Sequence, residues 1–515
     1  MNGLQKLTQS TLALMSVIVV AKLIGMSRDV VLANYFGTSN VSDAYLIAVS
    51  VPTLLFYFIG HALSTAYLPM YNKVKHDRGE EEAQKYSSNL ICIALLLCTV
   101  LVLILLAFPE IVIKLFAAGF DEDTVVLTAL FVRYSAASLY FMTIVNVWGG
   151  FLQANNNFIL PAMVSVPRNI VLIASIAFAA IYDVRYLGIG ILAAYIAEFL
   201  LLLPFVLKNG FKLRPVLQFH SPEIKETLYL VLPIVIGVGV SQINKIVDKS
   251  IASTIVSGGI SALNYASVIN NAVQEVLVTG IITILFAKCA AWVAAGKHDV
   301  VKAKLSETIG TMLFLLVPAS LGIIACAEPL VTCFLCRGEF NLNSVKMTTT
   351  ALCCYTAGLS FLAVRDTLVK VFYAYKDTKV TTITSIGAIL VNVGLNLVLS
   401  KFWGINGLAI ATSIAAALQC LVLYIVLHRK IGDFGLKTTL ITLCKVLIAG
   451  AVMYVAVSML YKVLIQQGLS ELVGLFICVF AGVVIYGLCS ILLKVTIPLA
   501  LFGKIKGRRK GVKTS

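Results

Sequence analysis

The chain is built from long, nearly uninterrupted apolar stretches, and these limit what it can fold into. A helix that crosses the hydrocarbon core of a bilayer needs about 20 consecutive, mostly apolar residues. Fourteen stretches meet that requirement, at approximately 11–34, 44–70, 87–108, 126–152, 160–181, 187–207, 227–256, 263–293, 305–326, 347–373, 380–401, 405–428, 440–464 and 472–497. Because 60% of the residues are hydrophobic and 12% are charged, a water-soluble fold could not bury this much apolar surface. The sequence predicts an all-α polytopic membrane protein with fourteen transmembrane helices.

The distribution of positive charge predicts how these helices are oriented. The net charge is +16, and most Lys and Arg residues lie in alternate gaps between the apolar stretches and in the tail at 501–515. Such a bias marks the cytoplasmic side of a membrane protein, so both termini are expected in the cytoplasm. The tail is expected to contact anionic membrane lipids. Because the charges are scattered over short gaps, we expect no nucleic-acid partner.

The sequence repeats itself weakly at an offset near 220 residues. The segment from residue 115 reads LFAAGFDEDTV and resembles CFLCRGEFNLNSV from residue 333, and LGIGILAAYIAEFL from 187 resembles WGINGLAIATSIAA from 403. Each copy contains six predicted helices. Because this number is even, the second copy begins on the same side of the membrane as the first, and the two copies have the same orientation. Two halves related in this way are typical of alternating-access transporters. We expect a lobe at 1–210, a second lobe at 211–430, two further helices at 431–500 and a cytoplasmic tail at 501–515.

Four sequence motifs resemble those of a known family. They read GMSRDVVLANYFGTSNVSDAYLIAVSVPTLL at 25–55, INKIVDKSIAS at 243–253, FYAYKDTK at 372–379 and GINGLAIATSIA at 404–415. Together and in this order they resemble the MurJ/MviN family of the MOP superfamily, the lipid II flippases of bacterial peptidoglycan synthesis. The resemblance implies a MATE-like fold in the bacterial cell membrane. It also implies alternating-access transport of the undecaprenyl-diphosphate-linked precursor, lipid II, from the inner to the outer leaflet, with cell-wall synthesis proteins as possible partners.

Cations within the apolar stretches are the main candidates for substrate binding. A charge at membrane depth is costly, and such residues usually face a bundle interior or a wet cavity. The resemblance matches Lys22 and Arg28 to two basic residues of the family's central cavity, where they would bind the anionic diphosphate. Lys245 and Lys249 lie one helical turn apart and would add positive charge to the same site.

Three further residues have two interpretations each. Asp29 either contributes to the substrate site or neutralises its neighbour Arg28. Asp43 matches a family carboxylate at the outward end of the first lobe, and the alternative is a cap for the second helix. His61 is either a proton-titrating group in the cavity or a hydrogen-bonded interior histidine.

Two departures from the family pattern lower the positive charge of the predicted site. Phe56 and Val268 stand where the family often has Arg. The predicted site is therefore less cationic than usual. This leaves open a flippase for another polyprenyl-linked glycan, such as an exopolysaccharide unit.

A group of oxygen-bearing side chains in the C-terminal half has two interpretations. Asn392 and Asn396 are four residues apart on one helix face, and Asp248 and Thr412 lie in neighbouring apolar stretches. By the resemblance, some family members hold sodium with a similar set. Hydrogen bonding between helices is the alternative, since Asn and Thr often link spans in this way.

The sequence does not indicate an enzyme. It contains no Walker A, HExxH or G-x-S-x-G motif, so transport would be driven by ion gradients or membrane potential. A cation-coupled multidrug exporter and a non-transporting membrane scaffold are the alternatives from other classes. The costly cations within the spans argue against the scaffold.

Overall fold

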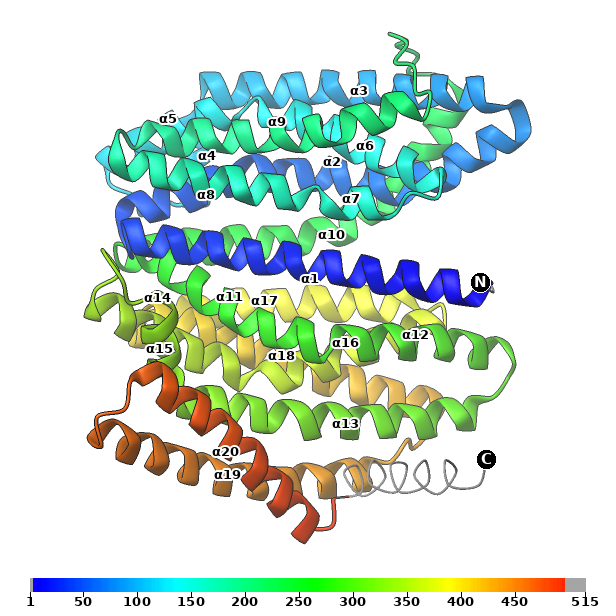
Figure 1. The fold of residues 1–515 in the computed structure, drawn as a ribbon. Helices are drawn as coiled ribbons and strands as arrows, with labels where there is room; N and C mark the ends of the chain where they lie inside the picture. Colours follow the sequence, from blue (N-terminus) through cyan, green and yellow to red (C-terminus); the bar gives the residue numbers. More distant parts are fainter. Residues whose placement is uncertain (1–2, 496–515) are drawn as a thin grey trace. The chain divides into compact units, whose positions relative to one another are not determined.

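The computed structural model describes residues 3–495, which fold into helices joined by loops (Figure 1). Within this part of the chain, eight helices are long and apolar enough to cross a membrane, or up to eleven if each of three bent helix pairs counts as one span. The bent pairs are α5/α6, α11/α12 and α15/α16, with bends of 44°, 45° and 42°. The predicted class of an all-helical polytopic membrane protein is thereby confirmed.

The chain divides into two compact units. Of the described residues, the first contains those up to 261 together with 337–341, and the second contains 262–336 and those from 342 onward. The loop at residues 209–221 lies inside the first unit.

The helices of the first unit cover residues 3–255. Their bounds are α1 Gly3–Phe36, α2 Asn40–Arg78, α3 Glu80–Ala107, α4 Pro109–Phe116, α5 Glu122–Ser135, α6 Ser138–Ala154, α7 Ile159–Met163, α8 Ser165–Ile181, α9 Arg185–Lys208 and α10 Pro222–Ile255. Aromatic residues of α2, α3 and α6 form its core, where Tyr67, Tyr71 and Phe151 are almost fully buried. Gly79 separates α2 from α3 with φ 89°, a conformation that glycine adopts readily.

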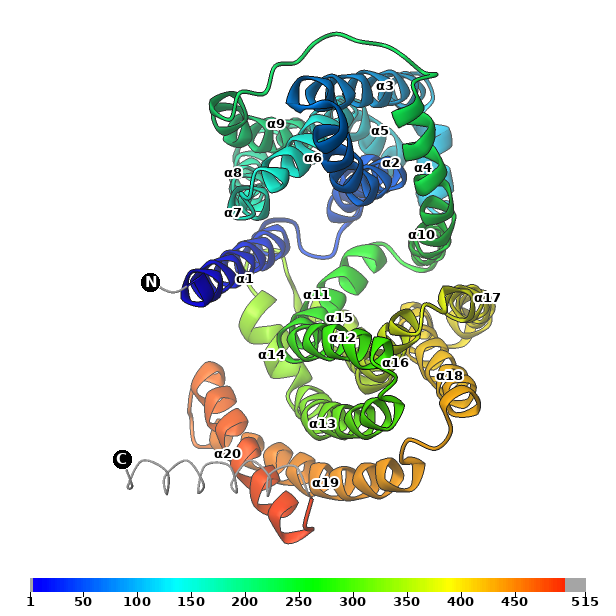
Figure 2. The ribbon, with the colours of Figure 1, turned by 90° about the vertical axis from the view of Figure 1, so that its right-hand side faces the viewer.

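The loop from α9 to α10 arches over the first unit (Figure 2) and is hydrogen-bonded to Gln84 and Asn89 of α3. Asn89 of α3 donates to Gln218 O at 2.9 Å and accepts from Gln218 N at 2.7 Å, as a neighbouring β-strand would. Gln84 makes the same kind of paired contact with Gly210 O and Lys212 N. The loop also buries Phe211, which is 4% exposed, in the core of this unit.

The first turns of α10 are fixed to the ends of α2 and α3 as well. Lys73 contacts Glu226 at 2.8 Å and Arg78 contacts Glu223 at 2.5 Å. Further along, Thr227 and Tyr86 share a hydrogen bond of 2.9 Å. These contacts explain why α10 groups with the first unit.

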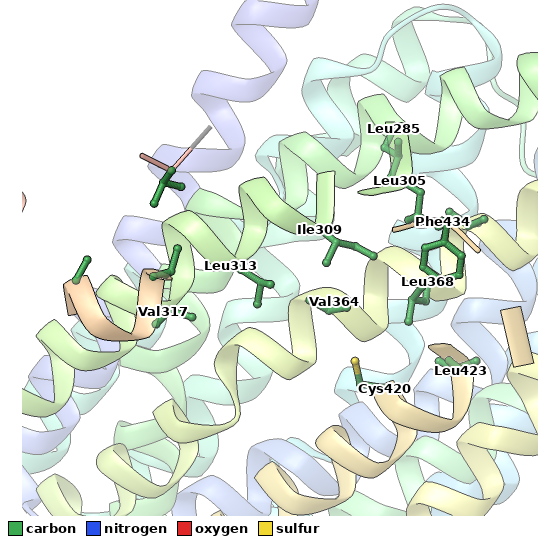
Figure 3. Close-up of a cluster of buried hydrophobic side chains, with 14 of the residues drawn as sticks. Leu285, Leu305, Ile309, Leu313, Val317, Val364, Leu368, Cys420, Leu423 and Phe434 are labelled. Atoms are coloured by element: carbon green, nitrogen blue, oxygen red, sulfur yellow. The ribbon is translucent and has the colours of Figure 1, made fainter. Parts of the chain in front are cut away.

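The helices of the second unit follow, and α11 begins at the boundary. Their bounds are α11 Gly259–Leu277, α12 Thr279–Ala294, α13 His298–Ala325, α14 Ala327–Leu335, α15 Leu342–Ala357, α16 Leu359–Ala374, α17 Thr378–Trp403, α18 Ile405–Ile431, α19 Leu436–Gln466 and α20 Glu471–Leu492. The core of this unit lies among α13, α16, α18 and α19. Figure 3 shows Ile309 and Leu313 of α13 beside Val364 and Leu368 of α16 and Leu423 of α18.

Candidate functional site

Arg28 lies on α1 in the first unit and is held by two neighbours. Its Nη2 donates to both carboxylate oxygens of Asp29, at 2.9 and 3.1 Å, and its Nη1 lies 3.4 Å from Asn169 Oδ1 on α8. The Arg28 side chain is 24% exposed and that of Asp29 is 6% exposed. Asp29 therefore offsets the positive charge, as one interpretation expected. Lys22 is exposed on the same helix.

Asp43 is buried in the first turn of α2 and binds a different helix from the one expected. Its Oδ1 accepts the backbone N–H of Ser261, at 2.7 Å, in the first turn of α11. The cap of α2 is Ser39, whose side chain accepts the N–H of Ser42. The predicted alternative that Asp43 caps α2 is therefore wrong. The sequence could not indicate this, because the two partners are 218 residues apart.

The two lysines on α10, Lys245 and Lys249, lie in different environments. Lys249 donates to Ser50 Oγ on α2 and lies within electrostatic reach of Asp43 and Lys245. Lys245 is exposed. Asp248, between them, accepts a hydrogen bond from Asn244 at 3.2 Å. Lys249 and Asp43 thus belong to one polar cluster of the first unit.

Three of the four proposed sodium ligands are joined in the second unit. Asn396 donates to Asn392 Oδ1 at 3.1 Å, and Asn392 Nδ2 lies 3.4 Å from Thr412 Oγ1 on α18. One hydrogen bond within α17 and one between α17 and α18 account for these contacts. Asp248 belongs to the first unit, and the sodium site stays a prediction. His61 lies on α2, but its side chain is outside the described part of the chain.

Sequence reasoning missed a buried ion pair in the first unit. Arg168 of α8 lies 3.0 Å from Glu198 Oε1 of α9, and the Glu198 side chain is 4% exposed. The Arg168 guanidinium also lies over the ring of Tyr195, 5.7 Å from its centre. Arg168 is the one charge in the apolar stretch 160–181, and Glu198 is the one charge in the next stretch, 187–207. The sequence therefore contained a signal for this ion pair, because two consecutive spans carry one charge each and the two charges are opposite.

A second missed cluster lies in the second unit. Arg365 Nη2 donates to Asp366 Oδ1 at 2.7 Å, and Gln274 of α11 donates to Asp366 Oδ2 at 3.1 Å. As with Arg28 and Asp29, the two charges are adjacent in sequence. Among the side chains that the structure describes, no group of three or more His, Cys, Asp or Glu could hold a metal ion.

Comparisons with known proteins identify the family. A family model described as lipid II flippase MurJ matches residues 32–491. A probable lipid II flippase MurJ of Thermotoga maritima is 28% identical over 480 residues, which cover 92% of this chain and 94% of that protein. The lipid II flippase MurJ of Thermosipho africanus is 29% identical over 418 residues, covering 80% and 84% respectively.

Solved structures agree with this assignment. A lipid II flippase MurJ in an inward closed conformation has a TM-score of 0.81 and 26% identity, and the match covers 94% of this chain and 99% of that one. An inward-facing multidrug resistance transporter of the MATE family has a TM-score of 0.69 at 14% identity, covering 82% and 98%, which shows a shared fold only. The family consists of membrane transporters, so the expectation of a non-enzyme is confirmed. Because the family model matches nearly the whole chain, this protein belongs to the lipid II flippase MurJ family.

Proposed function

We propose that this chain carries lipid II from the inner to the outer leaflet of the bacterial cell membrane by alternating access. The observation that supports this most is the family match over residues 32–491. The polar chemistry agrees with it, because a diphosphate lipid needs cationic groups at membrane depth. Membrane lipids would surround the protein, and proteins that make and consume the precursor would be its partners.

We propose fourteen transmembrane helices with both termini in the cytoplasm. The described residues contain eleven candidate spans when each bent helix pair is counted as one span. The long helices α1, α2 and α10, of 34, 39 and 34 residues, would bring the number to fourteen. The repeat at an offset near 220 residues supports two six-helix lobes at 1–210 and 211–430, with α19 and α20 added. The excess of Lys and Arg in alternate gaps supports the orientation.

We assign substrate binding to Arg28, supported by Lys22, Lys245 and Lys249. The Arg28 side chain is 24% exposed, and a guanidinium carries planar donors that match phosphate oxygens. Asp29, Asp43 and His61 belong to the same proposed site, where they would set its net charge rather than bind the diphosphate directly. A sodium ion held by Asp248, Asn392, Asn396 and Thr412 would couple transport to an ion gradient.

A flippase for another polyprenyl-linked glycan is the second candidate. Phe56 and Val268, where the family often has Arg, favour it because they leave fewer positive charges for the headgroup.

The decisive experiment is rescue of bacteria depleted of their own lipid II flippase. The full chain should restore growth, and Arg28→Ala should not. Arg133→Ala is the matched control, because Arg133 forms an exposed ion pair with Glu110 in the same unit. Failure of a well-expressed full chain to restore growth would favour the exopolysaccharide alternative.

A further inference from the structure

A cavity of about 310 Å³ lies inside the first unit, among α2, α6, α7, α8 and α9. Small-molecule sites typically measure about 300–1,000 Å³, so this cavity reaches the size of a binding site. Its lining combines the aromatic rings of Phe56 and Tyr195 with the polar side chains of Arg168, Glu198 and Asn146. The Arg168 side chain is 32% exposed and the Glu198 side chain is 4% exposed, so Arg168 is the more accessible member of the ion pair.

Two buried oxygens in this lining lack a hydrogen-bond donor. Glu198 is 3% exposed, and its Oε1 lies 3.0 Å from Arg168 Nη1. That N–H is not aligned for a hydrogen bond, and Oε1 accepts none from any described residue. The same holds for Asn146 Oδ1. Buried acceptors are normally satisfied, so both oxygens favour a ligand that brings hydrogen-bond donors.

The charges of the cavity restrict the ligand further. The opposite charges of Arg168 and Glu198 cancel, so the net charge of the cavity favours neither a simple cation nor a simple anion. The pair instead presents a donor beside an acceptor. A hydroxyl group can both donate and accept, and therefore suits this arrangement better than a group that does only one.

We propose that this cavity binds a neutral sugar ring. Its hydroxyl or amide N–H groups would donate to Glu198 Oε1 and Asn146 Oδ1, and one hydroxyl oxygen would accept from Arg168. The apolar face of the ring would pack against Phe56 or Tyr195. The proposal rests on the proposed function in one respect, since the sugar would be part of the lipid-linked headgroup.

Two neighbouring glycines on α6 provide a steric test. A Cβ at Gly149 would meet only Pro161 Cβ, at 3.6 Å, which is ordinary van der Waals contact. A Cβ at Gly150 would instead clash with the ring of Tyr67. Gly149→Ala is therefore expected to fold normally while adding a methyl group to the cavity wall.

The experiment measures sugar binding to the purified full chain in detergent by saturation-transfer NMR, with N-acetylglucosamine as the probe. The unaltered chain should transfer saturation to the ring protons. Asn146→Leu and Glu198→Gln should each weaken binding at least tenfold, and Gly149→Ala should weaken it severalfold. Glu110→Gln is the matched control, because it alters a Glu–Arg pair of the same unit that is exposed and outside the cavity. Thermal unfolding checks that each variant is folded.

The proposal is overturned if the sugar does not bind, or if folded cavity variants bind it as the unaltered chain does. Displacement of the sugar by inorganic phosphate or by sodium at ordinary ionic strength would overturn it too, because the cavity would then be an ion site. Growth rescue separates this result from the proposed function. A chain that rescues growth without binding the sugar refutes the sugar site alone, whereas sugar binding without rescue refutes lipid II transport alone.

Discussion

The carboxylate of Asp43 accepts a hydrogen bond from the backbone N–H of Ser261, 2.7 Å away and 218 residues later in the chain. It supplies a negative charge to the first turn of α11, where backbone N–H groups have no partner within the helix. One side chain thus joins the start of α2 to the start of α11.

We expect Asp43→Ala to lower the free energy of unfolding by about 1–3 kcal/mol, because it leaves a buried N–H without an acceptor. Asp43→Asn should cost less, since the amide oxygen can still accept. Thermal unfolding of the purified protein measures both effects. Asp121→Ala is the control, because Asp121 precedes α5 in the same unit without capping it through its side chain. Equal effects of Asp43→Ala and Asp121→Ala would contradict this role.

Arg28 is expected to be needed for transport. Arg28→Ala should lower the flipping rate in liposomes about 10- to 100-fold, the loss expected for one or two charge-assisted hydrogen bonds. Arg28→Lys should retain part of the rate, because it keeps the charge without the paired donors. Lys22→Ala should have a milder effect than Arg28→Ala.

Loss of Arg28 also leaves the nearly buried Asp29 carboxylate without its ion-pair partner, which could impair folding. The double variant Arg28→Ala, Asp29→Asn removes both charges and separates the two effects. If the double variant is folded and flips lipid II at the normal rate, Arg28 does not bind the substrate.

The sodium hypothesis predicts a change in ion dependence. Asp248→Asn should reduce the stimulation of flipping by sodium severalfold without reducing expression. Asn244→Ala is the control, because it removes the donor to Asp248 on the same helix but keeps the carboxylate. If transport shows no sodium dependence, or if Asp248→Asn leaves it unchanged, hydrogen bonding is the only role left for Asn392, Asn396 and Thr412.

One ion pair outside the spans should make stability depend on pH. The hydrogen bond from Lys430 lowers the pKa of Asp377 below its ordinary value of 3.8. Because the pKa of Asp377 is lower in the folded than in the unfolded protein, its ionised carboxylate stabilises the fold at pH values above the unfolded-state pKa. This stabilisation is lost as the pH falls through the folded-state pKa. The Tm of Asp377→Asn should therefore lie below that of the unaltered chain at pH 5–7, and the difference should shrink below about pH 4. A difference that grows in acid would contradict the assignment.

The helices could be predicted from the sequence more fully than the site. Every predicted apolar stretch overlaps a helix or a bent pair, because spans of about 20 apolar residues are defined locally. The placement of Asn392 and Asn396 on one helix face followed from their spacing by four residues, and the two side chains are joined by a 3.1 Å hydrogen bond.

Contacts between distant helices could not be predicted in the same way. The pairing of Arg168 with Glu198 depends on how α8 and α9 are rotated about their axes, and apolar residues surround each helix on most sides. The binding of Asp43 to Ser261 depends on chain segments that meet only after folding. The substrate and sodium roles of the candidate residues stay predictions.

The grouping of residues 337–341 with the first unit has a consequence for the order of biosynthesis. Glu339 N donates to Asn34 O at 2.9 Å, and Gly338 approaches the same carbonyl so closely that a Cβ there would clash with it. Domains of a growing chain generally fold as they emerge, N-terminal first. Here the first unit lacks part of its structure until five residues from the later half have been translated. The first unit therefore gains its full set of contacts only after residue 341 has been translated, and a nascent chain that stalls before residue 337 leaves the end of α1 without this contact.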